Sequence, residues 1–236
     1  MMPTQRLVFL LHRRPEVSRQ EFQHYWWTTH APLVAARAET LGIRRYQQVH
    51  TRMPAREGQP PEFDGVAELW ADAAPTGTPE ERAQAGAQLL ADEREFIDLA
   101  RSPIWMADEH VVLDEPHEGM RITVAVRRRP DATRQQFLAH FRDVHLPLVL
   151  ANNDVLGFRR YVQLHTPDDA ETIPLRAARG APEPFDAMSE IWLGRVVPTP
   201  ERAAEAMAVI RDDEAALYDP SGTIMWLSEV KVVVDR

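Results

Sequence analysis

Apolar and polar residues follow the same order in the two halves of this chain. The first half has an apolar run at 7–11, a stretch with apolar residues at helical spacing, and strands of period two at 43–51 and 63–70. A second helical stretch opens at Thr78, and an apolar strand follows at 104–113. The second half repeats each element, with strands at 122–126, 158–166, 185–192 and 225–234 and helices opening at Thr133 and Thr199. The pattern predicts the order βαββαβ, twice.

The halves also match residue by residue. Residues 7–51 align without a gap onto 122–166, and about two in five positions are identical. A duplication of this length indicates two domains of one fold rather than a solenoid. We expect these domains at 1–114 and 120–236, joined by a polar stretch that contains proline and glycine.

The order βαββαβ is that of the ferredoxin-like fold, an α+β arrangement with helices on one face of an antiparallel sheet. One copy leaves its other sheet face bare. Two copies in one chain are therefore expected to pack these faces into a closed barrel, a pseudo-dimer within one chain. The sequence leaves open whether two copies of the fused chain form a further homodimer. Residues 53–62 and 167–184 are predicted loops that could act as lids.

Composition narrows the partners and the cofactors. A net charge of −9 and a pI near 5.5 argue against nucleic acid and anionic membranes. The chain has no cysteine and no apolar run long enough for a membrane span, so we expect a soluble, cytoplasmic protein. It lacks the sequence signatures of NAD, flavin, ATP and zinc sites, which predicts that it binds no such cofactor and no metal.

Two histidines are the candidate catalytic groups. Trp26 and His30 lie four residues apart on the first helix, as do Phe141 and His145 in the second copy, so both histidines are predicted on the inward, aromatic stripe. A proline two residues later should kink each helix. An imidazole in an apolar cleft suits a general acid or base. The alternatives are a core histidine that bonds a backbone carbonyl, or a ligand of metal or haem.

Polar residues on the strands are the candidate substrate-binding groups. They combine phenol, amide, imidazole and carboxylate groups, which together could bind an enol or phenolate. The alternative is a network of hydrogen bonds that holds the two domains together. With Trp26 and Phe141, the candidates are Tyr46, Gln48, His50, Glu68, Trp70, Tyr161, Gln163, His165, Glu190 and Trp192.

The strand, proline turn, helix ending in His-x-Pro-Leu and strand Arg-Arg-Tyr-x-Gln-x-His resemble the EthD family of dimeric α/β barrels, here as a tandem fusion. The resemblance implies an enzyme acting on a small hydrophobic, aromatic or polyketide-like substrate. Its chemistry would be that of a cofactor-independent oxidoreductase or monooxygenase, or of an acid–base lyase that decarboxylates, dehydrates or cyclises. The resemblance leaves haem open, because barrels of this superfamily can hold it with one histidine. The alternative is a non-catalytic barrel that binds hydrophobic ligands or serves in a stress response.

Overall fold

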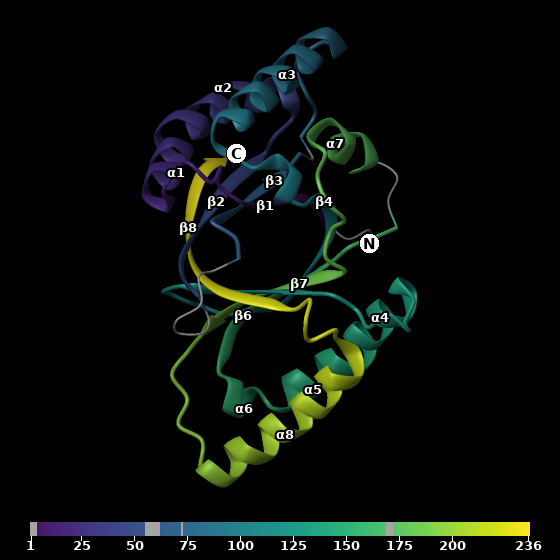
Figure 1. The fold of residues 1–236 in the computed structure, drawn as a ribbon. Helices are drawn as coiled ribbons and strands as arrows, with labels where there is room; N and C mark the ends of the chain where they lie inside the picture. The colour runs from purple at the N-terminus through teal and green to yellow at the C-terminus, as the bar shows by residue number, and fades with distance from the viewer. Residues whose placement is uncertain (1–3, 55–61, 72, 169–171) are drawn as a thin grey trace. The chain divides into compact units, whose positions relative to one another are not determined.

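The computed structural model describes residues 4–54, 62–71, 73–168 and 172–236, and its elements follow the predicted order in both repeats (Figure 1). The first repeat contains β1 (Thr4–Leu11), α1 (Arg19–Tyr25), η1 (Trp26–His30), α2 (Ala31–Leu41), β2 (Arg45–Pro54), β3 (Gly65–Trp70), α3 (Pro79–Phe96), η2 (Leu99–Arg101) and β4 (Ile104–Asp114). The second contains β5 (Arg121–Val126), α4 (Arg134–His140), η3 (Phe141–His145), α5 (Leu146–Ala151), α6 (Asn153–Leu156), β6 (Phe158–His165), α7 (Thr172–Arg179), β7 (Ala187–Leu193), α8 (Pro200–Leu217) and β8 (Ile224–Asp235).

Within the described residues, the strands are hydrogen-bonded in the order β1-β3-β2-β8-β5-β7-β6-β4, which closes as a barrel. β3 is central to the first repeat and pairs antiparallel with both β1 and β2. β7 holds the same place in the second repeat, between β5 and β6. The predicted α+β fold, two ferredoxin-like repeats fused into one barrel, is confirmed.

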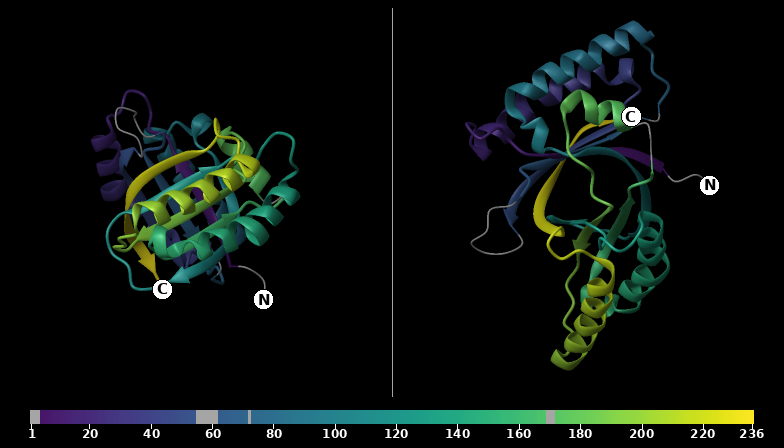
Figure 2. Two further views of the ribbon diagram at one scale, coloured as in Figure 1. Left: turned by 90° about the horizontal axis from the view of Figure 1, so that it is seen from below. Right: turned by 45° about the vertical axis from the view of Figure 1, so that its right-hand side comes forward.

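The contacts of the chain divide it into two units. Unit 1 comprises residues 1–109, 166–184 and 226–236, and unit 2 comprises 110–165 and 185–225. In unit 1, α2 and α3 run side by side (Figures 1 and 2). In unit 2, α8 runs beside the helices that follow β5 (Figure 2). The predicted repeat boundaries at 1–114 and 120–236 describe the duplication itself and stay a prediction.

Helix ends form where the sequence predicts them. The side chain of Ser18 accepts a hydrogen bond from the amide of Glu21, whose carboxylate accepts one from the Ser18 amide. Thr78 and Glu81 form the same capping box at α3. α2 ends at Gly42, which adopts φ +72°, a conformation that glycine reaches without strain.

One predicted loop contains a helix. Within residues 167–184 the chain forms α7, which belongs to unit 1 although it comes from the second repeat. Its last residue, Arg179, donates two hydrogen bonds of 2.8 Å to the buried carboxylate of Glu93 on α3. This ion pair attaches the helix, so the prediction of an irregular loop was wrong for 172–179. In the other predicted loop, β2 extends to Pro54, and residues 55–61 lie outside the described part of the chain.

Candidate active site

Each candidate histidine closes a π-helical turn. η1 ends at His30, and the amide of Ala31 donates to the carbonyl of Trp26, five residues back. η3 ends at His145 with the same bond one repeat later. A π turn thus lies where the sequence predicts a kink, two residues before each proline. Such turns are rare and frequently occur at functional sites. Both imidazoles are buried, with 6% and 4% of their surface exposed.

His30 forms a dyad with Asp92 of α3. The Nδ1 atom of His30 lies 2.6 Å from one carboxylate oxygen of Asp92, and the hydroxyl of Tyr25 donates to the other at 2.8 Å. Burial alone would raise the pKa of Asp92, but the hydrogen bonds from His30 and Tyr25 outweigh it and hold that pKa below its usual value. A carboxylate at this place keeps the proton on Nδ1, so Nε2 carries the lone pair of a base.

His145 forms the equivalent dyad with Asp213 of α8. Its Nδ1 atom lies 2.7 Å from one carboxylate oxygen, and Nε2 of His140 lies 2.7 Å from the other. The hydroxyl of Tyr218 lies 3.3 Å from Nε2 of His145. Burial lowers the pKa of His145, and Asp213 opposes this shift only in part. Neither dyad fits the alternative of a histidine that bonds a backbone carbonyl.

In unit 1, the predicted helix and strand residues meet in one buried network. Trp26 Nε1 donates to the hydroxyl of Tyr46 at 3.2 Å, and Gln48 Nε2 donates to the same oxygen at 2.9 Å. The other end of that amide, Oε1, lies 3.0 Å from Nε2 of His50, whose ring stacks on Trp26. Burial, followed by Lys231 and Arg52, lowers the pKa of His50 to about 3, so it is neutral. Burial also raises the pKa of Tyr46.

Unit 2 contains the matching network. Gln163 donates to the hydroxyl of Tyr161 at 2.8 Å, and its Oε1 lies 3.1 Å from Nε2 of His165. Phe141 stacks on His145 and also contacts His165, with ring centroids 5.6 Å apart. Burial lowers the pKa of His165 to about 3, so this imidazole is neutral as well.

The carboxylates and tryptophans of the third strands lie on the other sheet face. Tyr46 pairs directly with Leu69, whereas Gln47 pairs with Glu68, and directly paired residues share a face. Tyr46, Gln48 and His50 therefore face away from Glu68 and Trp70. The structure separates the groups that the sequence analysis combined into one set.

On that second face, these residues are paired with arginines. Arg6 lies 3.4 Å from the carboxylate of Glu68, and its guanidinium lies over Trp70 at 4.9 Å from the ring centroid. In unit 2, Arg121 donates to Glu190 at 2.9 Å and lies over Trp192 at 5.9 Å. Glu68, Trp70, Glu190 and Trp192 therefore belong to buried clusters around an arginine and not to the surroundings of either dyad.

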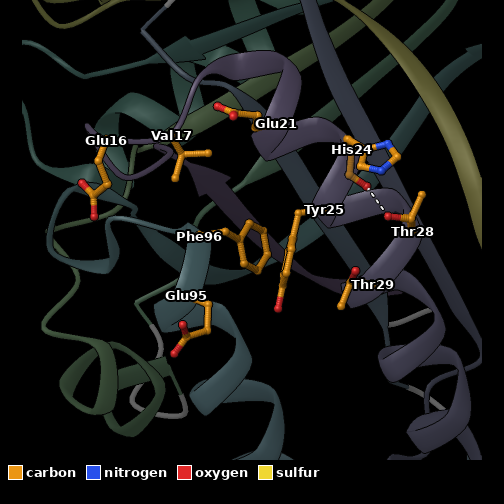
Figure 3. Close-up of a pocket in the computed structure, with 9 residues that line it drawn as sticks. All are labelled: Glu16, Val17, Glu21, His24, Tyr25, Thr28, Thr29, Glu95 and Phe96. Carbon is orange, nitrogen blue, oxygen red and sulfur yellow. Dashed lines mark hydrogen bonds between the residues drawn. The ribbon is translucent and has the colours of Figure 1, made fainter.

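A hollow of about 400 Å³, whose lining residues are drawn in Figure 3, lies next to two residues that contact the first dyad. Its inner wall contains Tyr25, the residue that donates to Asp92, and the ring of Phe96, which lies 5.3 Å from that of His30. Glu95 and His24 border it from α3 and α1. Neither Trp26 nor His30 is one of its lining residues, so this hollow is not the apolar cleft that the sequence analysis expects around the imidazole. The lining residues are Glu16, Val17, Glu21, His24, Tyr25, Thr28, Thr29, Glu95 and Phe96.

Sequence reasoning missed both aspartates and their further partners. Asp92 and Asp213 lie in polar stretches of α3 and α8 where nothing in a single copy marks them. The useful signal was the repeat, since the capping threonines Thr78 and Thr199 are 121 residues apart, as are the two aspartates. Nor did sequence reasoning identify His140, whose Nε2 contacts Asp213.

The described side chains can be compared with what a metal ion or a haem iron requires of its ligands. Among the described residues, no group of three or more histidine, aspartate or glutamate side chains could hold a metal ion. An axial ligand needs a free Nε2, and that atom of His145 lies within hydrogen-bonding distance of Tyr218. His145 therefore does not fit a haem iron. No described helix combines the length and apolar character needed to cross a membrane.

The chain was compared with known proteins. The EthD domain model matches residues 14–100 and 129–221, one match in each repeat. Curated proteins gave no match. Among solved structures, the chain is similar to a proposed monooxygenase from Fusobacterium nucleatum, with 10% identity over 98% of this chain and 95% of the other and a TM-score of 0.50. It is also similar to a mutant chlorite dismutase from Candidatus Nitrospira defluvii, with 10% identity over 97% and 93% and a TM-score of 0.51. At this identity the two likenesses concern the fold.

Proposed function

We propose that this chain, which belongs to the EthD domain family, is an enzyme that transfers protons on a small aromatic or polyketide-like substrate, with His30 as acid and base. The observation that carries the proposal is the 2.6 Å contact between Nδ1 of His30 and the carboxylate of Asp92. The contact directs the lone pair of Nε2 outward from Asp92, and it stabilises the imidazolium that forms when Nε2 accepts a proton.

The first step removes a proton from a hydroxyl or an activated carbon of the substrate. The substrate becomes a phenolate or enolate, and His30 holds the proton on Nε2 while Asp92 stabilises the imidazolium through Nδ1. The substrate is proposed to bind at the hollow next to Tyr25 and Phe96, since these residues contact the dyad and their aromatic rings suit a flat molecule. His30 can return the proton at a later step, to the carbon of an enolate or to a leaving hydroxyl.

The deprotonated substrate can react in several ways without a bound organic cofactor. An enolate forms when a β-keto acid loses CO2, and an enolate also attacks a second carbonyl during cyclisation. An electron-rich phenolate or enolate can instead pass electrons to O2 and form a C–O bond to it. The resulting peroxide takes up a proton and loses water as its O–O bond breaks, so one oxygen stays on the substrate as a carbonyl and the other leaves as water. We propose that the protein works without haem, and the visible absorbance of the purified protein tests this. A Soret band that disappears in His30→Ala would contradict it.

The test of activity uses a panel of polyhydroxylated aromatic compounds and polyketones, incubated with protein under air and under argon and analysed by mass spectrometry. Product that needs air indicates oxygenation, and product under both gases indicates a lyase. We expect His30→Ala to lower turnover by about 10² or more. His117→Ala is the matched control, since this exposed imidazole lies outside the site. Binding of panel compounds without any product would favour the non-catalytic barrel.

Two further proposals concern the surroundings of the protein. We propose a cytoplasmic location, which cell fractionation tests. A homodimer of the fused chain is tested by sedimentation of the purified protein.

A further inference from the structure

The two dyads differ at the position that faces Nε2 of the histidine. The isolated bridge between Arg13 and Ile97 in unit 1 has its counterpart between Arg128 and Tyr218 in unit 2, so Ile97 and Tyr218 are structural equivalents. Each follows the second long helix of its repeat as the C-cap residue. One copy therefore places an aliphatic side chain where the other places a phenol.

We infer that only the first dyad works as a base, and that in the second copy Tyr218 blocks the base by occupying Nε2 of His145. This inference rests on the proposed function of His30 and assigns Tyr218 as the residue that makes the second dyad structural. The fused chain then has one catalytic and one structural copy of the same pair.

The geometry of unit 2 leaves its imidazole without a free nitrogen. Nδ1 of His145 is bound to Asp213, and the hydroxyl of Tyr218 lies 3.3 Å from Nε2 with the two rings edge to face. Since Nδ1 carries the proton, the phenol must be the donor in the second contact. Burial raises the pKa of Tyr218 well above its usual value, so the hydroxyl keeps its proton.

The carboxylate of this dyad is fully used as well. Both oxygens of Asp213 bind imidazoles, one from His145 and one from His140. Four side chains thus form one continuous chain of hydrogen bonds, Tyr218–His145–Asp213–His140. Buried polar groups that are all paired are typical of a structural network.

In unit 1, the same chain of contacts stops at the histidine. Ile97 has no group that could bind Nε2 of His30, and no hydrogen bond reaches that nitrogen within the part of the chain that the structure describes. The other end of the chain is Tyr25, which lines the hollow shown in Figure 3. Among the described residues, the first imidazole therefore keeps a free lone pair on Nε2, and the second does not.

The first experiment measures the reactivity of each histidine in the intact protein with diethyl pyrocarbonate, followed by peptide mass spectrometry. This reagent attacks an unprotonated nitrogen that is not engaged in a hydrogen bond. The exposed His24 serves as the internal reference. We expect His30 to be modified at least about tenfold faster than His145, the factor that one hydrogen bond supplies.

Two variants test the phenol hydroxyl that distinguishes the copies, one by removing it from unit 2 and one by introducing it in unit 1. Tyr218→Phe removes one oxygen atom and should speed the modification of His145 about tenfold. Ile97→Tyr should slow the modification of His30. Because Ile97 is buried and a larger side chain there overpacks the core, Tyr218→Phe is the decisive variant. Equal rates at His30 and His145 in the unchanged protein, or no effect of Tyr218→Phe on His145, would overturn the inference.

Turnover of a panel compound separates this inference from the proposed function. If both hold, His30→Ala lowers turnover by about 10² or more and Tyr218→Phe keeps it. A loss of tenfold or more in Tyr218→Phe would show that the second copy takes part, which contradicts the inference and leaves His30 as the base. Full turnover in His30→Ala would contradict the proposed function, whereas the reactivities would still decide whether Tyr218 blocks His145.

Discussion

Acid should destabilise this protein through two buried, neutral histidines. His50 and His165 have folded-state pKa values of about 3, mainly because burial penalises the charged imidazole. The unfolded chain binds protons near the ordinary histidine pKa of about 6.5. Between these values the unfolded state carries more protons than the folded state, so the free energy of unfolding falls as the pH falls from about 6.5 toward 3.

The size of the effect follows from the two pKa values. For one histidine whose pKa moves from about 6.5 to about 3, lowering the pH from 7 to 5 removes about 2 kcal/mol of stability. Two such histidines in separate units remove about 4 kcal/mol. Charged neighbours act on the same pKa values: Lys231 and Arg52 lower that of His50 and Glu229 raises it, and His110 and Arg142 lower that of His165.

The assay is urea unfolding at pH 7 and pH 5, followed by tryptophan fluorescence. The control is the double variant His50→Gln and His165→Gln, since glutamine offers an amide donor to Gln48 and Gln163 but does not titrate. The control should lose about 4 kcal/mol less than the unchanged protein between the two pH values. If both proteins lose the same free energy, the imidazoles are not held neutral by burial, and the reasoning is refuted.

Three further predictions concern single positions. Asp92→Asn should lower turnover by about 10² or more while the melting temperature stays close to that of the unchanged protein, because the amide no longer fixes the proton on Nδ1 of His30; turnover within a factor of two would refute the dyad. Arg179→Ala should lower the free energy of unfolding, measured in urea, by about 3 kcal/mol, because it leaves the buried Glu93 unpaired. The control Arg176→Ala loses only an exposed partner, Glu183, and should lower it by less than about 1 kcal/mol; equal losses would contradict the argument. Gly65→Ala should destabilise the fold by about 1–3 kcal/mol, because the added Cβ would lie within 2.9 Å of two atoms of Trp26. Its control, Gly86→Ala in α3, has open space around it and should stabilise the fold by up to about 1 kcal/mol; thermal unfolding that ranks the two variants otherwise would refute the argument.

The repeat made most of the fold predictable. Local signals such as the capping boxes at Ser18 and Thr78 set the helix starts, and a second copy with the same signals at the same spacing confirmed each element. The helix at 172–179 escaped because the segment between the second and third strands is longer in the second repeat, so no aligned sequence of the first repeat could support a prediction there. Its attachment depends on the distant Glu93, and a local pattern contains no information about such a contact.

The site was predictable only in part, for a similar reason. The helical spacing of Trp26 and His30 correctly placed the imidazole inside, but a periodic pattern cannot reveal a π turn, because the turn adds one residue without changing the sequence signal. The partner Asp92 lies 62 residues further on, in a stretch rich in charged side chains. The strand parity also could not show that Glu68 faces away from Tyr46, since that depends on the register between β2 and β3.

The two copies also reveal which buried contacts the fold requires. In unit 1, the hydroxyl of Tyr46 accepts from the indole of Trp26. Phe141 replaces this tryptophan in unit 2 and has no donor, and there the hydroxyl of Tyr161 lies 3.5 Å from Ser189 instead.

The side-chain volumes at two packed positions also differ between the units, in compensating directions. Trp26 packs against Gly65, where a Cβ would clash with the indole, and the smaller Phe141 leaves room for Ala187 at the equivalent position. Two different sets of residues thus satisfy the same buried phenol and fill the same space. A requirement that survives such divergence is one of packing and hydrogen bonding. The tyrosine–glutamine–histidine networks therefore support the barrel, and the difference that matters for chemistry is the one between Ile97 and Tyr218, where one copy closes off its histidine and the other does not.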